Sequence, residues 1–195
     1  MAAGLFEISK FMGNMTKGGA LSSLFSVRIT GLPSKLLTNK SLSTGAHFAI
    51  KTASFPASTI ATTEVSYMGR TVTIPANREA QQITTEFYND EDHALRGDLL
   101  KWMDGINGHT TNQRKMTATQ FADYRGTMEI VQHMKDKPDA DKNPNVVTVH
   151  SCWPSEVAEV TLDWESNEVQ TFEVTWEMSH WTQTAGKVGA QPDST

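Results

Sequence analysis

The chain has 195 residues, a formal net charge of −5 and one cysteine, Cys152, which suits one domain with a hydrophobic core and excludes an internal disulfide. The acidic balance argues against the clustered lysines and arginines with which proteins grip nucleic-acid phosphates. No run of about 18 apolar residues is present, so we expect no membrane insertion. Glu7 within the short apolar N-terminal stretch, with no basic leader, argues against a signal peptide.

Residues 1–20 form an N-terminal segment whose apolar side chains fall at helical spacing but whose glycines weaken a helix. One interpretation is a frayed terminus. The other is an arm that becomes ordered on a neighbouring subunit, since bulky apolar side chains are unusual in a purely solvated tail. The candidate contact residues of such an arm are Leu5, Phe6, Ile8, Phe11 and Met12.

Alternating apolar and polar residues predict a series of half-buried β-strands. In the first of them, Val27 and Ile29 alternate with polar neighbours. The predicted strands are residues 24–30, 47–53, 83–89, 124–134 and 146–152. Between the first two strands, residues 33–46 show no period and are expected to form a loop, which contains Leu36 and Leu37.

A hairpin is predicted over residues 59–74, with Gly69 in its turn, because glycine at the second turn position is a frequent hairpin signal. Pro56 is expected to break the ladder before this hairpin, and residues 75–78 are expected to close it. Residues 135–145 alternate charges around two prolines and predict the exposed tip of another hairpin.

One substantial helix is predicted, from an acidic start at residues 89–92 to Ile106. Leu95, Leu99 and Trp102 fall on one apolar stripe of this helix. The acidic start offers an N-cap and places negative charge at the positive end of the helix dipole. A single helix among many strands is expected to cover one end or face of a β-sandwich.

The stretch from Trp153 to Trp181 predicts a second hairpin with one aromatic, apolar face and one acidic, hydroxyl-rich face. Its second half alternates strictly over residues 171–178, its first half alternates less cleanly over residues 159–164, and turn formers lie between them. The polar side of the second half consists of Thr171, Glu173, Thr175 and Glu177. Beyond Trp181 the chain lacks core formers, so a flexible tail is expected.

Candidate catalytic and metal-binding residues are sparse. His150 lies two residues from Cys152, on the same predicted strand face, but a zinc site needs three or four ligands. Glu173 and Glu177 are expected near Glu159, but catalysis needs a concave, partly apolar site, and a flat row of carboxylates and threonines is typical of a solvated face. No phosphate-binding loop or nucleophile elbow occurs. We therefore expect no enzymatic activity, no metal and no cofactor.

A chain with many strands, one helix and no evident active site is left with unpaired strand edges. Such edges invite pairing with another chain. Several subunits can bury their edges by closing one barrel together. This pattern suggests an assembly protein.

Several short segments carry a family resemblance. They are Leu24–Val27, Lys51–Ala57, Met68–Arg70, Ile74–Arg78, Asn89–Glu91, Lys101-Trp102, Trp153-Pro154, Leu162–Trp164 and Gln170–Thr175. In their order and spacing these segments resemble the tail tube proteins of contractile-tailed bacteriophages over most of the chain. The chain departs from the family pattern in the loop 33–46, in residues 109–121 and beyond Trp181.

The resemblance implies a mainly β fold, an antiparallel β-sandwich or barrel with one capping helix, which is also similar to the tube of type VI secretion systems. It implies that six copies form a ring, that part of each sheet joins an inner barrel, and that rings stack into a hollow tube within a contractile sheath. The implied partners are other copies of the chain, the tail sheath, baseplate and tail-terminator proteins, and genomic DNA that passes through without specific binding. The implied location is the virion tail, assembled in the host cytoplasm.

We accordingly expect an N-terminal arm at residues 1–20, a tube domain at residues 21–182 and a flexible tail at residues 183–195. An acidic lumen would repel phosphates and let DNA slide. The residues expected to face this lumen are Thr62, Glu64, Ser66, Thr171, Glu173, Thr175 and Glu177. The residues expected to contact other subunits or stacked rings are Leu5, Phe6, Ile8, Phe11, Met12, Leu36, Leu37, Phe55 and Pro56.

Two alternatives remain open at this point. One is a baseplate protein of the same fold, which initiates the tube and often carries an extra domain. The other is a β-sandwich that binds or hydrolyses carbohydrate, which would need exposed aromatic residues or a carboxylate pair in a cleft.

Overall fold

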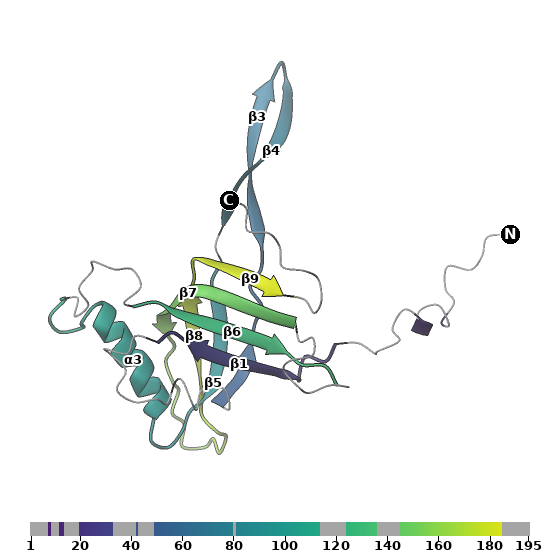
Figure 1. The fold of residues 1–195 in the computed structure, drawn as a ribbon. Helices are drawn as coiled ribbons and strands as arrows, with labels where there is room; N and C mark the ends of the chain where they lie inside the picture. Colours follow the sequence, from purple (N-terminus) through teal and green to yellow (C-terminus); the bar gives the residue numbers. More distant parts are fainter. Residues whose placement is uncertain are drawn as a thin grey trace.

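Antiparallel strand pairing dominates the computed structural model (Figure 1), which describes residues 20–32, 49–79, 81–113, 124–135 and 145–184 together with the single positions 8, 12, 13 and 42. In chain order the elements are β1 (Phe25–Thr30), β2 (Ile50–Ala53), β3 (Thr59–Tyr67), β4 (Arg70–Glu79), β5 (Ile83–Tyr88), α3 (Ala94–Ile106), β6 (Gly126–Gln132), β7 (Asn145–Val157), β8 (Thr171–Glu177) and β9 (His180–Thr184). The predicted mainly β fold with one capping helix is confirmed.

Strand β7 belongs to two layers of the fold. Its first part pairs with β6 and β9, and its last part, Trp153–Val157, pairs with β8, so the strand order runs β1-β6-β7-β8-β5-β2. Ser151 has a φ of 56°, and the pairing register shifts beside it. A strand that bends in this way can turn the corner between two packed sheets.

The core lies between these layers and follows the predicted alternation. Ile83 and Phe87 of β5 face inward with Phe172 and Trp176 of β8, and all four are buried. The Trp176 Nε1–H donates a 2.8 Å hydrogen bond to the buried Thr85 hydroxyl, which provides the polar partner that each buried group requires. The apolar residues of β1, β6 and β7 complete the core: Val27, Ile29, Met128, Ile130, Val147 and Val149.

Helix α3 closes one end of the core through the predicted stripe. Leu95, Leu99 and Trp102 are buried, and the Trp102 ring meets the Trp176 ring edge to face at 5.9 Å between centroids. A Cβ at Gly126 would lie 3.1 Å from the Trp102 ring, so this close approach favours glycine.

The predicted acidic start of the helix is wrong. Helix α3 begins at Ala94, its N-cap position is His93 with a φ of 50°, and no side chain caps it. The acidic residues instead form a turn, in which the His93 N–H donates to the Asp90 carbonyl at 2.9 Å. Asn89 lies beside the start of β8, because its N–H donates at 2.8 Å to the carbonyl of Gln170, the residue before that strand. This turn therefore connects β5 to the helix, which begins after it.

The predicted strand at residues 159–164 is also wrong, because residues 158–170 form a loop between β7 and β8. The Ala158 N–H donates to the Glu173 carbonyl, which continues the pairing of β7 with β8 for one more residue. The chain then turns at Asp163, whose carboxylate accepts from the Glu165 N–H at 3.0 Å. Leu162 is 83% exposed and Trp164 is fully exposed.

The hairpin predicted around Gly69 is confirmed, but it is longer than predicted. Residues 75–78 do not close it, since β4 continues through Pro75 to Glu79. The register shifts between Ile60 and Thr62, next to the position opposite Pro75. An irregular ladder is where a strand accommodates a proline, which has no N–H to donate.

At the C-terminal end, β9 pairs with β7 and runs through Thr184, so it overlaps the start of the tail expected from residue 183. Residues 185–195 lie outside the described part of the chain, as do nearly all of the predicted loop 33–46 and most of the predicted hairpin tip 135–145.

Candidate assembly surfaces

The outer side of the β2-β5-β8 sheet carries a row of hydroxyl and carboxylate groups. Thr84 lies opposite Thr175, and Glu86 lies opposite Glu173. We call this surface the polar sheet face, formed by Thr52, Thr84, Glu86, Thr171, Glu173, Thr175 and Glu177. A shallow groove of about 370 Å³ crosses it, with Glu159 on one side. The four β8 residues expected to face a lumen therefore share one surface.

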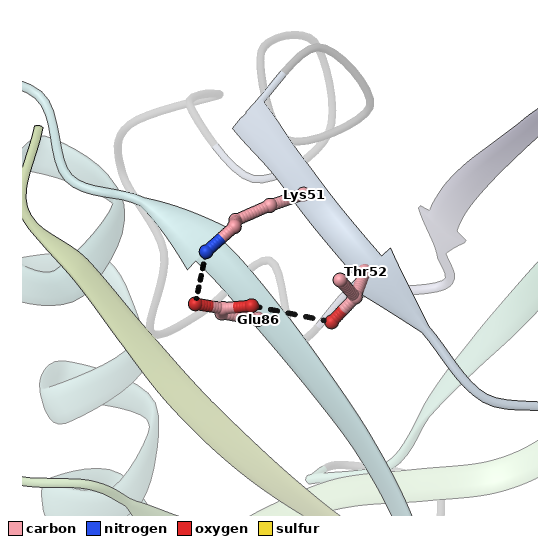
Figure 2. A network of polar contacts seen from close by, with 3 residues as sticks. All are labelled: Lys51, Thr52 and Glu86. Atoms are coloured by element: carbon pink, nitrogen blue, oxygen red, sulfur yellow. Dashed lines mark hydrogen bonds and ion pairs between the residues drawn. The ribbon is translucent and has the colours of Figure 1, made fainter. Parts of the chain in front are cut away.

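One lysine moderates the charge of this surface. The Lys51 ammonium donates to the Glu86 carboxylate at 2.8 Å, and the Thr52 hydroxyl donates to it at 3.5 Å (Figure 2). The hydrogen bond from Lys51, aided by one from Thr171, lowers the pKa of Glu86, and Glu86 in turn raises the pKa of Lys51. Because directly opposed like charges destabilise a sheet, Lys51 offsets the repulsion between Glu86 and Glu173.

Helix α3 packs on the opposite side of β8 from the polar sheet face. The Arg96 guanidinium lies 5.5 Å from the centre of the Phe172 ring, and Trp102 contacts Trp176. Phe172 and Trp176 point inward and alternate with the outward Glu173 and Thr175. The helix therefore leaves the polar sheet face uncovered.

The β3–β4 hairpin projects from the body and has two different faces (Figure 1). Opposed residues of an antiparallel pair lie on the same face. One face is apolar and consists of Val65, Tyr67, Val72 and Ile74 with Thr63 and Arg70. The other is polar and consists of Thr62, Glu64, Ser66, Thr71 and Thr73. We call them the apolar hairpin face and the polar hairpin face; the expected lumen residues Thr62, Glu64 and Ser66 lie together on the second.

The residues expected at subunit contacts are only partly described. Ile8 and Met12 are exposed, Phe55 is 44% exposed and Pro56 is buried. Leu5, Phe6, Phe11, Leu36 and Leu37 lie outside the described residues.

Two exposed apolar surfaces were not predicted as contact sites. One is the apolar hairpin face, which the alternation of Val65, Val72 and Ile74 with threonine could have indicated. The other is on the loop between β7 and β8, where Leu162, Trp164 and Val169 are exposed. The alternation of Leu162 and Trp164 with polar residues is that of a strand, so the sequence pattern concealed this second surface.

The expectation that His150 and Cys152 share a strand face is wrong. The left-handed backbone of Ser151 shifts the alternation, so Cys152 points into the core and His150 points outward. The His150 ring stacks on His180 at 4.6 Å, and burial, together with the charge of His180, lowers the pKa of His150. Burial raises the pKa of the Cys152 thiol to about 12.

The described residues contain no group of three or more histidine, cysteine, aspartate or glutamate side chains placed to hold a metal ion. No helix within this part of the chain has both the length and the apolar character needed to cross a membrane.

Comparisons with known proteins agree with this geometry. The family model described as "Phage tail tube protein" matches residues 20–184. The chain is similar to tail tube protein gp19 of Enterobacteria phage T4, with 29% identity over 135 residues that cover 69% of this chain and 79% of the relative. Tail tube protein gp19 of Enterobacteria phage T6 is 30% identical over 135 residues, with the same coverage of both chains.

A solved structure shows the same fold at low sequence identity. It is the sheath/tube terminator of the PVC extracellular contractile injection system in its extended state, with a TM-score of 0.60 and 15% identity. The match covers 86% of this chain and 97% of that chain.

Proposed function

Because this chain belongs to the phage tail tube protein family and is a structural component of a contractile virion tail, we propose that its copies form stacked hexameric rings around a central bore. The rings build the inner tube through which the genome passes. Each ring closes an inner barrel from the sheets of its subunits, which removes the unpaired strand edges.

The apolar hairpin face carries the proposal of assembly. Val65, Val72 and Ile74 remain exposed on a two-stranded ribbon that extends away from the core. An isolated hairpin is marginally stable in water, and a contiguous exposed apolar patch marks an interaction site. Another copy of the chain supplies the missing apolar surface in the assembled tube.

The polar sheet face and the polar hairpin face line the bore in this proposal. The expected lumen residues are Thr171, Glu173, Thr175 and Glu177 on the sheet and Thr62, Glu64 and Ser66 on the hairpin. Carboxylates and hydroxyls offer no counterion release to a passing phosphate backbone, so DNA slides without specific binding. The one lysine on the sheet is paired with Glu86, which supports this assignment.

The proposed partners follow from the same architecture. They are further copies of the chain, the contractile sheath around the tube, and the baseplate and terminator proteins at its ends. We propose contacts between rings through the N-terminal arm, the loop 33–46 and the 54–58 segment, where Phe55 is exposed. In this role the protein performs no reaction and needs no cofactor or metal.

Negative-stain electron microscopy of the purified protein over a concentration series tests the proposal. We expect rings at low concentration and hollow tubes at higher concentration, or tubes that appear when preformed baseplates are added. Monomers that persist in the presence of baseplates would contradict it.

A further inference from the structure

The loop between β7 and β8, residues 158–170, exposes apolar side chains among carboxylates, and we call it the acidic loop. Leu162, Trp164 and Val169 are exposed in it. Its acidic residues are Glu159, Asp163, Glu165 and Glu168, and the chain has no lysine or arginine between residues 143 and 186. A fully exposed tryptophan in an acidic setting fits a partner that is both apolar and basic.

The tip of the β3–β4 hairpin has this complementary character. Tyr67 and Met68 are 71% and 86% exposed at the turn. Arg70 follows them, and no aspartate or glutamate lies between residues 65 and 78. The hairpin tip therefore combines an aromatic ring, a flexible thioether and a positive charge.

The two surfaces lie at opposite ends of one copy. In the β5–β8 pair, Ile83 lies opposite Trp176 and Tyr88 lies opposite Thr171. The hairpin enters β5 at the Ile83 end, whereas the acidic loop enters β8 at the Thr171 end. Figure 1 shows the hairpin rising from one end of the body and the yellow-green loop below the other. Within one copy the two surfaces therefore cannot cover each other.

We infer that the hairpin tip of one copy docks on the acidic loop of a neighbouring copy, an inference that rests on the proposed tube assembly. Arg70 lies against Asp163 and Glu165 in this contact, and Tyr67 and Met68 cover Trp164. The charged pairs fix the register, and the contact of a guanidinium or thioether with an indole ring adds attraction. Because two different surfaces meet, the contact is heterologous and propagates from copy to copy.

A second receptor for the hairpin is the groove between α3 and β7, lined by Leu100, Met103, Ile106, Trp153 and Pro154 among others. It is apolar but offers fewer carboxylates, with Asp104 as the acidic residue in its lining. The acidic loop matches both the charge and the apolar character of the tip, so the observations favour it. A cysteine placed in each receptor in turn distinguishes the two.

Site-specific disulfide formation tests the contact, because the native thiol of Cys152 is buried and unreactive. Full-length Met68→Cys and Trp164→Cys proteins are mixed, assembled and oxidised. We expect a covalent pair in the mixture and none in either protein alone. A mixture of Met68→Cys with Leu100→Cys, whose thiol would lie in the lining of the groove between α3 and β7, is the matched control and is expected not to react.

A charge exchange gives an independent readout. Arg70→Glu alone and Glu165→Arg alone are each expected to raise the concentration needed for assembly roughly tenfold, and the double variant is expected to restore it. Lys135→Glu, at an exposed position beyond the end of β6, is the control for the same change in net charge.

The outcomes distinguish this inference from the proposed function. Tubes that show no Met68–Trp164 cross-link, or that cross-link through position 100, would overturn the docking contact and leave the tube intact. Failure to assemble under any condition, including with baseplates, would overturn both.

Discussion

The packed body and the β3–β4 hairpin use the same alternation of apolar and polar residues with different results. In the body, the apolar sides of β5 and β8 are buried in the core of their own copy, and Phe87 and Trp176 have no exposed surface. In the hairpin, Val72 is still 59% exposed. Alternation therefore predicts an amphipathic strand, but it does not say whether the covering surface belongs to the same chain or to another.

The largest expected effect on folding is in the body. Trp176→Ala removes a buried ring, its edge-to-face contact with Trp102 and the hydrogen bond to Thr85. We expect the free energy of unfolding to fall by about 3–5 kcal/mol. Urea unfolding followed by circular dichroism at a concentration that keeps the protein unassembled measures this change. A loss below about 1 kcal/mol would show that the core tolerates the cavity and that burial of Trp176 does not dominate the stability of the body.

A hairpin variant is expected to separate assembly from folding. Val65→Ser with Val72→Ser makes the apolar hairpin face polar without touching the core. We expect the unfolding free energy to change by no more than about 0.5 kcal/mol, whereas association weakens by about 2 kcal/mol or more. Sedimentation velocity and electron microscopy measure the association. The matched control, Thr71→Ser with Thr73→Ser, changes the polar hairpin face and is expected to assemble normally. If both double variants associated equally well, the two hairpin faces would not differ in their role in assembly.

The smallest expected effect concerns the charge pair on the polar sheet face. The pKa of Glu86 is lowered in the folded protein, so its contribution to stability is present above its unfolded pKa and is lost as the pH falls through the folded value. The pKa of Lys51 is raised, so its contribution is present below its unfolded pKa and is lost as the pH rises through the folded value. The pair therefore contributes its full stability between pH 4.5 and pH 10.5, the ordinary pKa values of the two groups. The contribution is lost in stronger acid and in stronger base.

Lys51→Met is the variant that tests this pair. We expect a slightly lower melting temperature near neutral pH, a difference that shrinks in acid and at high salt because the pair is exposed. Lys135→Met provides the control for loss of a positive charge. If the two variants showed the same pH dependence of the melting temperature, the pair would have no specific role.

The strands and the apolar stripe of the helix could be predicted because the spacing of their apolar residues matches the side chains that are buried within one copy. Phe172, Trp176 and Trp102 were placed on the correct faces by periodicity alone. Three local features could not be found in this way. The helix begins only at Ala94, after a turn in which the His93 N–H donates to the Asp90 carbonyl, and the turn at Asp163 interrupts an alternating stretch that has no partner strand. The left-handed backbone of Ser151 separates His150 from Cys152.

The candidate assembly surfaces could be predicted less completely for a related reason. The polar rows of β8 and β3 are visible in the sequence, and the structure places each on one uncovered face. The apolar hairpin face and Trp164 were missed because an exposed apolar residue has the same sequence pattern as a buried one. Only the positions of the other elements show that nothing in the described part of the same copy covers them.

Electron cryomicroscopy of the assembled tube would show which faces of each copy are covered and which line the bore. We expect Val65, Val72 and Ile74 to be buried against another copy and Glu86 and Glu173 to face the bore. A tube in which the apolar hairpin face remains exposed, or in which the polar sheet face is buried between copies, would contradict it.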